Sequence, residues 1–142
     1  MNDFIFDQAL TERIYRTMPY AQFIGLRAGY EEEKQQLLFL LPFREMLIGN
    51  TMLPALHGGL IGGFMESAAA IFLHYHAGLA ELPKIVDFSL DYLRSGKPED
   101  TYAGCILTRQ GSRIANLAIK TWQRDPNQPI AIGRAHFLMP ER

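Results

Sequence analysis

Residues 50–70 read NTMLPALHGGLIGGFMESAAA, and this stretch decides the fold of the chain. The run from Gly58 is apolar almost without interruption and predicts a helix to about His76, with Gly78 as its stop. A helix that is apolar nearly all round needs to be buried, so the rest of the chain has to surround it. Glu66 is an acid inside that apolar run, which is costly unless the protein uses the carboxylate. The glycine pair at the helix start leaves backbone N–H groups open to a polarised oxygen.

The segments around this helix have the two-residue period of strands. We expect a short helix over 6–18, with Ile5, Leu10 and Ile14 on one side, ended by Pro19. Strands are expected over 23–33 and 35–41, followed by a loop over 44–54. Four more strands are expected as a meander over 86–92, 102–109, 113–123 and 130–138. Helices and strands do not alternate, so the prediction is an α+β fold: a curved antiparallel sheet of about six strands round one helix, the hotdog arrangement.

Length and composition are those of one globular domain over 1–142, with 48% hydrophobic and 20% charged residues. The net charge of -1 argues against a nucleic-acid partner. Residues 1–4 lack a signal-peptide pattern, and Glu66, His74 and His76 interrupt the apolar stretch over 60–79, so no membrane span is expected. A single cysteine, Cys105, suits a core residue in a cytoplasmic protein.

The spacing of Gly58 and Glu66 predicts a second subunit. Eight residues of helix separate them by ~12 Å along the axis, so one small group cannot touch both in the same chain. Gly59, Gly63, Glu66 and Ala70 form a stripe of small residues with one acid. Two such helices lying antiparallel would bring Gly58 of one chain to Glu66 of the other. We therefore expect a homodimer with shared sites, pairing further into a homotetramer.

From Asn50 onward, the sequence resembles the hotdog-fold acyl-CoA thioesterases, in the phenylacetate-pathway (PaaI-like) branch. That family has His-Gly-Gly at the start of its central helix and Asp or Glu nine positions after the His, which matches His57 and Glu66. An Asn before the His is also typical of the family, and Asn50 is the candidate. Many members have Asp where this chain has Glu, so the reach of the acid and the preferred acyl group differ.

The resemblance implies an acyl-CoA thioesterase, and it implies a role for each residue. The Gly58 N–H would hold the oxyanion at the helix start, with Gly59 as a second donor. Glu66 would be either a general base for water or a nucleophile. Asn50 would position the water or the carboxylate. His57 would fix the loop by hydrogen bonding or take part in the chemistry.

Other residues are expected to bind the substrate rather than react with it. Arg94, Arg109 and Arg113 lie at a strand end and around a hairpin turn, where arginine forks suit the phosphates of coenzyme A. Ser67, next to Glu66, is a further substrate-binding candidate. The remaining aromatic and sulfur side chains of this region are candidates for an acyl tunnel or for plain core: Phe64, Met65, Phe72 and Tyr92.

No cofactor or metal is expected, since coenzyme A is itself part of the substrate. His74 and His76 are two positions apart and point in different directions on a helix, so they do not make a zinc pair. Two other functions stay open: a non-catalytic acyl-CoA binding protein, and a hotdog hydratase or dehydratase. The Asp-x-Asn-x-x-His pattern of the hydratase branch is not present.

Overall fold

The computed structural model describes residues 4–140; residues 1–3 and 141–142, at the two ends of the expected domain, lie outside the described part. The described elements are, in chain order, β1 (Phe4–Phe6), α1 (Gln8–Thr17), α2 (Pro19–Ile24), β2 (Arg27–Glu31), β3 (Leu37–Leu41), a 3-10 turn η1 (Glu45–Leu47), β4 (Ile48–Asn50), β5 (Ala55–Leu56), α3 (Gly58–His76), β6 (Lys84–Tyr92), β7 (Thr101–Gln110), β8 (Ile114–Trp122) and β9 (Ala131–Leu138).

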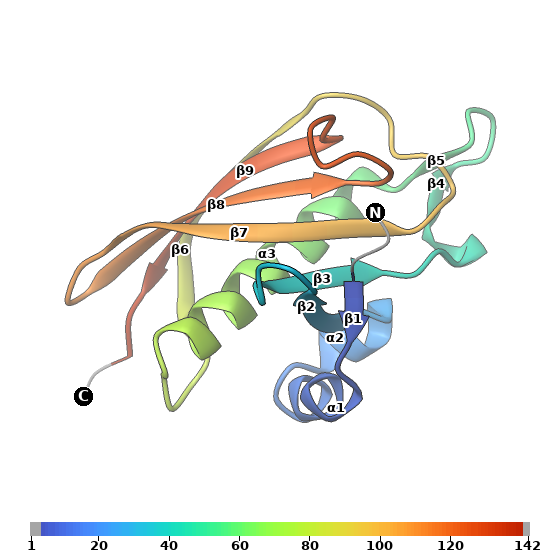
Figure 1. Ribbon diagram of the computed structural model, residues 1–142. Helices are drawn as coiled ribbons and strands as arrows, with labels where there is room; N and C mark the ends of the chain where they lie inside the picture. The colour runs from blue at the N-terminus through green and yellow to red at the C-terminus, as the bar shows by residue number, and fades with distance from the viewer. Residues whose placement is uncertain (1–3, 141–142) are drawn as a thin grey trace.

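The long helix α3 packs against one face of an antiparallel sheet whose strand order is β1-β2-β3-β7-β8-β9-β6. Figure 1 shows that the long strands β7, β8 and β9 cross α3, and that α1 and α2 lie beside the β1–β3 end of the sheet. The buried side of α3, with Phe64, Met65 and Ile71 at its centre, meets sheet residues such as Phe39 and Phe137 in one core. This arrangement confirms the α+β hotdog fold.

The helix α3 begins and ends as the sequence predicts. The His57 side chain accepts a hydrogen bond from the Leu60 N–H and caps the first turn. At the other end, Gly78 has φ +63°, and the Leu79 N–H returns to the His74 carbonyl at 2.9 Å. Within residues 4–140, no helix is long and apolar enough to cross a membrane.

Two features of the sheet differ from the prediction. Within residues 4–140 it has seven strands instead of about six, and β4 and β5 form a separate two-stranded sheet. The last four strands are not a simple meander, because β6 pairs with β9 at the edge while β7 pairs with β3. The chain crosses from β6 to the middle of the sheet, and strand periodicity carries no information about that partner choice.

The N-terminal segment also differs. Phe6 belongs to strand β1, and the helix starts after Asp7, whose carboxylate accepts the Leu10 N–H at 2.9 Å. The strand expected over 23–33 begins only at Arg27, because residues 19–24 form α2. Pro19 ends one helix and starts the next, since proline suits the first helical turn. Gly25, at φ +78°, then turns the chain into β2.

The expected loop over 44–54 contains the turn η1 and the hairpin β4–β5.

Strand β6 also carries a bulge between Ile85 and Asp87. This extra residue shifts the alternation, so Val86 is 55% exposed instead of facing inward with Phe88 and Leu90.

Candidate functional site

The first turn of α3 presents two backbone N–H groups. His57 uses its carbonyl and its ring Nδ1 to accept from the Ile61 and Leu60 N–H groups, at 3.1 and 3.3 Å. The N–H groups of Gly58 and Gly59 precede these and have no partner within the helix. Gly59 is exposed and Gly58 is half-buried. The pair therefore forms an open donor site at the positive end of the helix dipole.

Neighbouring segments hold His57 in place. Its N–H donates to the Leu47 carbonyl at 2.9 Å, and the preceding Leu56 N–H donates to the Gly96 carbonyl at 2.9 Å. Gly49 passes so close that a Cβ there would lie 2.6 Å from the His57 Cα. The start of α3 is thus fixed to β4 on one side and to the loop after β6 on the other.

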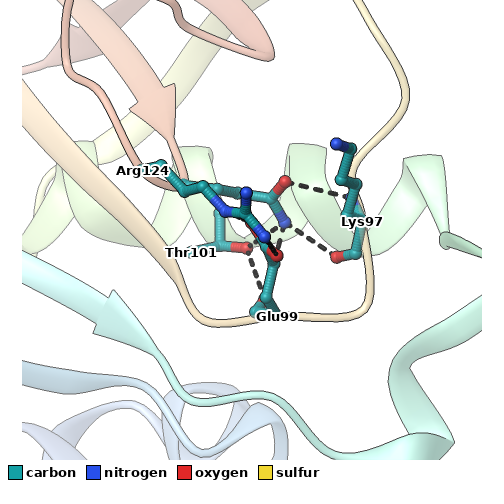
Figure 2. A network of polar contacts seen from close by, with 5 residues as sticks. Lys97, Glu99, Thr101 and Arg124 are labelled. Atoms are coloured by element: carbon teal, nitrogen blue, oxygen red, sulfur yellow. Dashed lines mark hydrogen bonds and ion pairs between the residues drawn. The ribbon is translucent and has the colours of Figure 1, made fainter.

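That loop, residues 93–100, is fastened by the polar network of Figure 2. The Gln123 amide accepts from the Lys97 N–H at 3.0 Å and donates to the Lys97 carbonyl at 2.8 Å. It also donates to the Thr101 hydroxyl at 3.2 Å. Arg124 pairs with both carboxylate oxygens of Glu99, at 3.1 and 2.9 Å. The network holds Gly96 where its carbonyl supports β5.

Tyr92 connects the edge strand β6 to the donor site. Its hydroxyl donates to the Gly58 carbonyl at 2.7 Å, and a Cβ on Gly58 would lie 3.3 Å from that hydroxyl oxygen. The sequence placed Tyr92 only as a possible tunnel or core residue. The side chain is instead 55% exposed and lies over the first turn of α3. Nothing local in the sequence marks this contact, because it joins residues 34 positions apart.

Glu66 lies on the side of α3 that the sheet does not cover. Gly62, Gly63 and Glu66 are only half-buried, and Gly59 is exposed. This face was expected to be buried, and within residues 4–140 the structure leaves it partly open. Among the described residues, the Glu66 carboxylate makes no hydrogen bond and no ion pair.

The open face has two borders. On one side, Leu90 of β6 approaches Gly62, where a Cβ would lie 3.2 Å from its Cδ2 atom. On the other side, the Tyr20 hydroxyl of α2 lies 2.5 Å from the position of a Cβ on Gly63. Because α3 runs unbroken from Gly58 to His76, Gly58 and Glu66 are separated by ~12 Å along its axis, as the sequence predicts. Donor site and acid are separate within one chain.

Asn50 and Ser67 are not brought to Glu66. The Asn50 Oδ1 atom accepts from the Met52 and Leu53 N–H groups at 2.9 and 3.2 Å, so it closes the β4–β5 turn. Ser67 is 5% exposed, because one residue beyond Glu66 the helix has turned by ~100° into the core. Phe64, Met65 and Phe72 are core residues as well.

The three arginines lie at two different ends of the sheet. Arg94 follows β6 at the end where Tyr92 meets Gly58, and its Nη1 atom contacts Gln128 Oε1 at 3.4 Å. Arg109 and Arg113 flank the β7–β8 hairpin, which Figure 1 shows on the side of the molecule where α3 ends. A single chain therefore does not gather them around one ligand.

Other titratable groups lie away from the open face. His74 Nδ1 lies 3.2 Å from the Glu81 carbonyl, and the His76 ring stacks on Phe72. His136 pairs with Asp87 at 3.5 Å across β9 and β6. Cys105 is in the core, as expected, and burial raises the pKa of its thiol. Within residues 4–140, no group of three His, Cys, Asp or Glu side chains is arranged to hold a metal ion.

A pocket that the sequence did not reveal opens beside the donor site. Its volume is about 350 Å³, and it lies between α2, the segment 46–48 and the first turn of α3. Its lining is Tyr20, Phe23, Ile24, Met46, Leu47, Ile48, His57, Gly59 and Leu60.

Comparison with known proteins identifies the class to which this fold and site belong. Residues 53–130 match the thioesterase superfamily. The chain is 31% identical over 112 residues to the medium/long-chain acyl-CoA thioesterase YigI of Escherichia coli K12, covering 69% of this chain and 71% of that protein. It is 29% identical over 122 residues to the YigI protein of Salmonella typhimurium, covering 76% and 77%. The chain therefore belongs to the thioesterase superfamily and is a thioester hydrolase.

Solved structures agree on the fold. A crystal structure of a protein from Chromobacterium violaceum is 46% identical, with a TM-score of 0.75 over 95% of this chain and 93% of that one. A protein from Bacillus halodurans, solved with CoA, has a TM-score of 0.73 over 95% and 94%. At 14% identity, this second likeness extends to the fold alone.

Proposed function

We propose that the protein hydrolyses acyl-CoA to a free acid and coenzyme A. The observation that carries this is helix α3, which starts with two open N–H groups and has Glu66 on its partly open face, with no partner for the carboxylate within residues 4–140. The names of the YigI relatives support acyl-CoA as the substrate class. The reaction needs only water besides these groups, so we propose no cofactor.

In the proposed reaction, the Gly58 N–H donates to the thioester oxygen and stabilises the negative charge that develops there, with Gly59 as a second donor. As a general base, Glu66 takes a proton from water while the water oxygen attacks the carbonyl carbon. The carbon–sulfur bond then breaks, and the departing thiolate takes up a proton. As a nucleophile, the Glu66 carboxylate would instead attack the carbonyl carbon and expel the coenzyme A thiolate, which takes up a proton. Water would then hydrolyse the mixed anhydride to the free acid and restore the Glu66 carboxylate.

The complete site belongs to a homodimer in this proposal. The ~12 Å between Gly58 and Glu66 exceeds the reach of one thioester group. Gly59 and Glu66 lie on the partly open face of α3, where a second chain can pack beside Tyr20, which lies over Gly63. Within residues 4–140, β6 is an edge strand with one side unpaired. Antiparallel helices would also bring Arg109 and Arg113 to the end where Gly58 of the partner subunit lies. Pairing of dimers into a tetramer remains part of the proposal.

Within the superfamily, we propose the PaaI-like branch. The support is the His57-Gly58-Gly59 motif at the start of α3, with Glu66 nine positions after the His on the open face. In this chain the typical Asn, Asn50, closes a turn within its own subunit. Its amide nitrogen remains available for a contact with a partner subunit.

Glu66→Gln tests the proposed chemistry. The amide keeps the shape of the side chain but cannot accept a proton or form an anhydride, so kcat should fall by about 100-fold or more. Glu81→Gln, on the exposed loop after α3, is the matched control and should change nothing. The readout is free thiol release from acyl-CoA, with the melting temperature as a check on folding. Activity within a few-fold of wild type would show that another group is the base.

Mixing experiments test the shared site. Glu66→Gln chains and chains damaged at Gly58 should each be inactive alone. In a hybrid dimer, one of the two sites has both an intact Gly58 and an intact Glu66, so activity should return on mixing. A wild-type protein that is fully active as a monomer at the assay concentration would exclude the dimeric site.

A further inference from the structure

The pocket beside the donor site has the composition of a binding site for an unbranched hydrocarbon. Its side chains are apolar except for the His57 ring and the Tyr20 hydroxyl, and three of them are both large and exposed: Phe23 at 65%, Met46 at 59% and Tyr20 at 42%. Large apolar side chains gathered at the rim of a hollow mark a surface that a ligand or partner covers. The pocket offers a ligand few polar partners, and an apolar chain needs none.

The two outer walls of the pocket are tied together. Tyr20, Phe23 and Ile24 come from α2, and Met46 and Leu47 come from η1. The Arg44 guanidinium, just before η1, donates to the Phe23 carbonyl at 2.9 Å. It also packs against Gly25, where a Cβ would lie 3.4 Å from its Nη2 atom. The pocket therefore exists before a ligand enters.

The position of the pocket determines which part of a substrate reaches it. Gly59 belongs to the open N–H pair and also lines the pocket. A thioester whose oxygen accepts from that N–H pair lies next to this hollow, so its acyl chain can enter it. Burial in the apolar hollow is the favourable choice.

Tyr20 closes the pocket along α3. Its hydroxyl lies over Gly63, one turn beyond Leu60, so the phenol stands across the direction in which a chain would continue along the helix. Beyond Gly63, that side of the helix carries Glu66 and the small residues Ser67 and Ala70. The Tyr20 hydroxyl has no hydrogen-bond partner among residues 4–140, so the side chain acts there by its bulk.

We propose that this pocket takes the acyl chain and that Tyr20 is the specificity-determining residue that limits chain length. The inference rests on the proposed acyl-CoA function. At roughly 30 Å³ per carbon, about the volume of a water molecule in the liquid, a pocket of about 350 Å³ accommodates a chain of medium length. Replacing Tyr20 by a small residue would extend the pocket over Gly63 toward Ala70.

Chain-length profiles test the proposal. The substrates are butanoyl-, octanoyl-, dodecanoyl- and hexadecanoyl-CoA, and the quantity compared is kcat/KM for hexadecanoyl-CoA divided by that for octanoyl-CoA. Each methylene newly buried contributes a factor of about four. Tyr20→Ala should therefore raise the ratio about tenfold or more, and Tyr20→Phe, which keeps the ring, should leave it unchanged. Tyr75→Ala, an exposed tyrosine on the last turns of α3, is the matched control.

A second variant and a second readout keep the test decisive. Leu60→Phe fills the pocket from the α3 side and should shift the preference toward butanoyl-CoA, whether or not Tyr20→Ala folds. Binding of the matching S-alkyl-CoA thioethers, measured by calorimetry, should show the same length dependence without hydrolysis. A wild type that binds these thioethers but hydrolyses no thioester would refute the proposed function and leave the pocket assignment standing.

Two results would overturn the assignment itself. One is a length profile that neither Tyr20→Ala nor Leu60→Phe moves while the enzyme stays active. The other is a change of oligomeric state in these variants with an unchanged profile, which would show that a second copy of the chain covers the hollow.

Discussion

The Tyr92 hydroxyl of β6 donates to the Gly58 carbonyl of α3 over 2.7 Å, so the edge strand holds the peptide next to the proposed oxyanion donor. Tyr92→Phe removes this hydrogen bond and keeps the ring. It should cost about 1 kcal/mol and lower the melting temperature by about 3 °C. If the contact orients the donor, kcat should fall several-fold while KM changes little. Tyr75→Phe is the control, and an unchanged kcat would limit Tyr92 to a structural role.

Gly58 permits a direct test of the oxyanion N–H. Gly58 is the first residue of α3, where proline is well tolerated, and His57 at ψ 126° has the conformation that precedes proline. Gly58→Pro therefore deletes the N–H while the helix keeps its start. We expect kcat to fall by about 100-fold.

Gly58→Ala is the matched control, because it adds the same Cβ, 3.3 Å from the Tyr92 hydroxyl, but keeps the N–H. Equal losses in both variants would attribute the effect to crowding against Tyr92. A fully active Gly58→Pro protein would transfer the oxyanion role to Gly59.

The arginines should act on coenzyme A through charge. Replacing Arg94, Arg109 or Arg113 by Ala should raise KM for acyl-CoA more than it lowers kcat, since a distant phosphate contact is equal in ground and transition states. The same variant should barely affect an acyl-N-acetylcysteamine, which lacks the phosphates. Added salt should weaken CoA binding more in wild type than in the responsible variant. If KM is unchanged in all three variants, other residues bind the phosphates, and Arg44 and Lys97 are the next candidates.

Gln123 should matter for stability more than its half-buried position indicates. Gln123→Ala removes the contacts that hold Lys97 and Thr101, and with them the loop that supports β5. We expect a loss of about 2 kcal/mol in urea denaturation and faster proteolysis within residues 93–100. Gln128→Ala, whose side chain has one long contact with Arg94, should change the free energy of unfolding by no more than a few tenths of a kcal/mol.

The buried thiol of Cys105 should make the free energy of unfolding depend on pH. Burial raises the pKa of the thiol above its ordinary value of 9.0. Above pH 9 the unfolded chain loses this proton and the folded chain keeps it, so stability declines with rising pH, by up to about 1.4 kcal/mol per pH unit. Cys105→Ala should lack this component in urea titrations at successive pH values. Rapid alkylation of the native thiol at neutral pH would contradict the burial.

Local patterns in the sequence were enough to predict α3 and most of the strands. The bounds Gly58–His76 follow from an apolar run between a capping His and a left-handed Gly78, all within one segment. The hairpin of β7 and β8 follows from its short turn, which places the two strands side by side. The combination of a helix-start glycine pair with an isolated acid likewise required no tertiary information.

Only the tertiary structure decided which elements meet. Strand periodicity cannot tell that β6 pairs with β9, because the hydrogen-bonding groups of every strand are alike. The contact of Tyr92 with Gly58 and that of Tyr20 with Gly63 join segments that are distant in sequence, so no local signal marks them. Asn50, in contrast, satisfies its own turn, which the chemistry of its amide allows as readily as a catalytic contact. Residue types thus determined the available chemistry, while long-range packing decided which of them share the open face of α3.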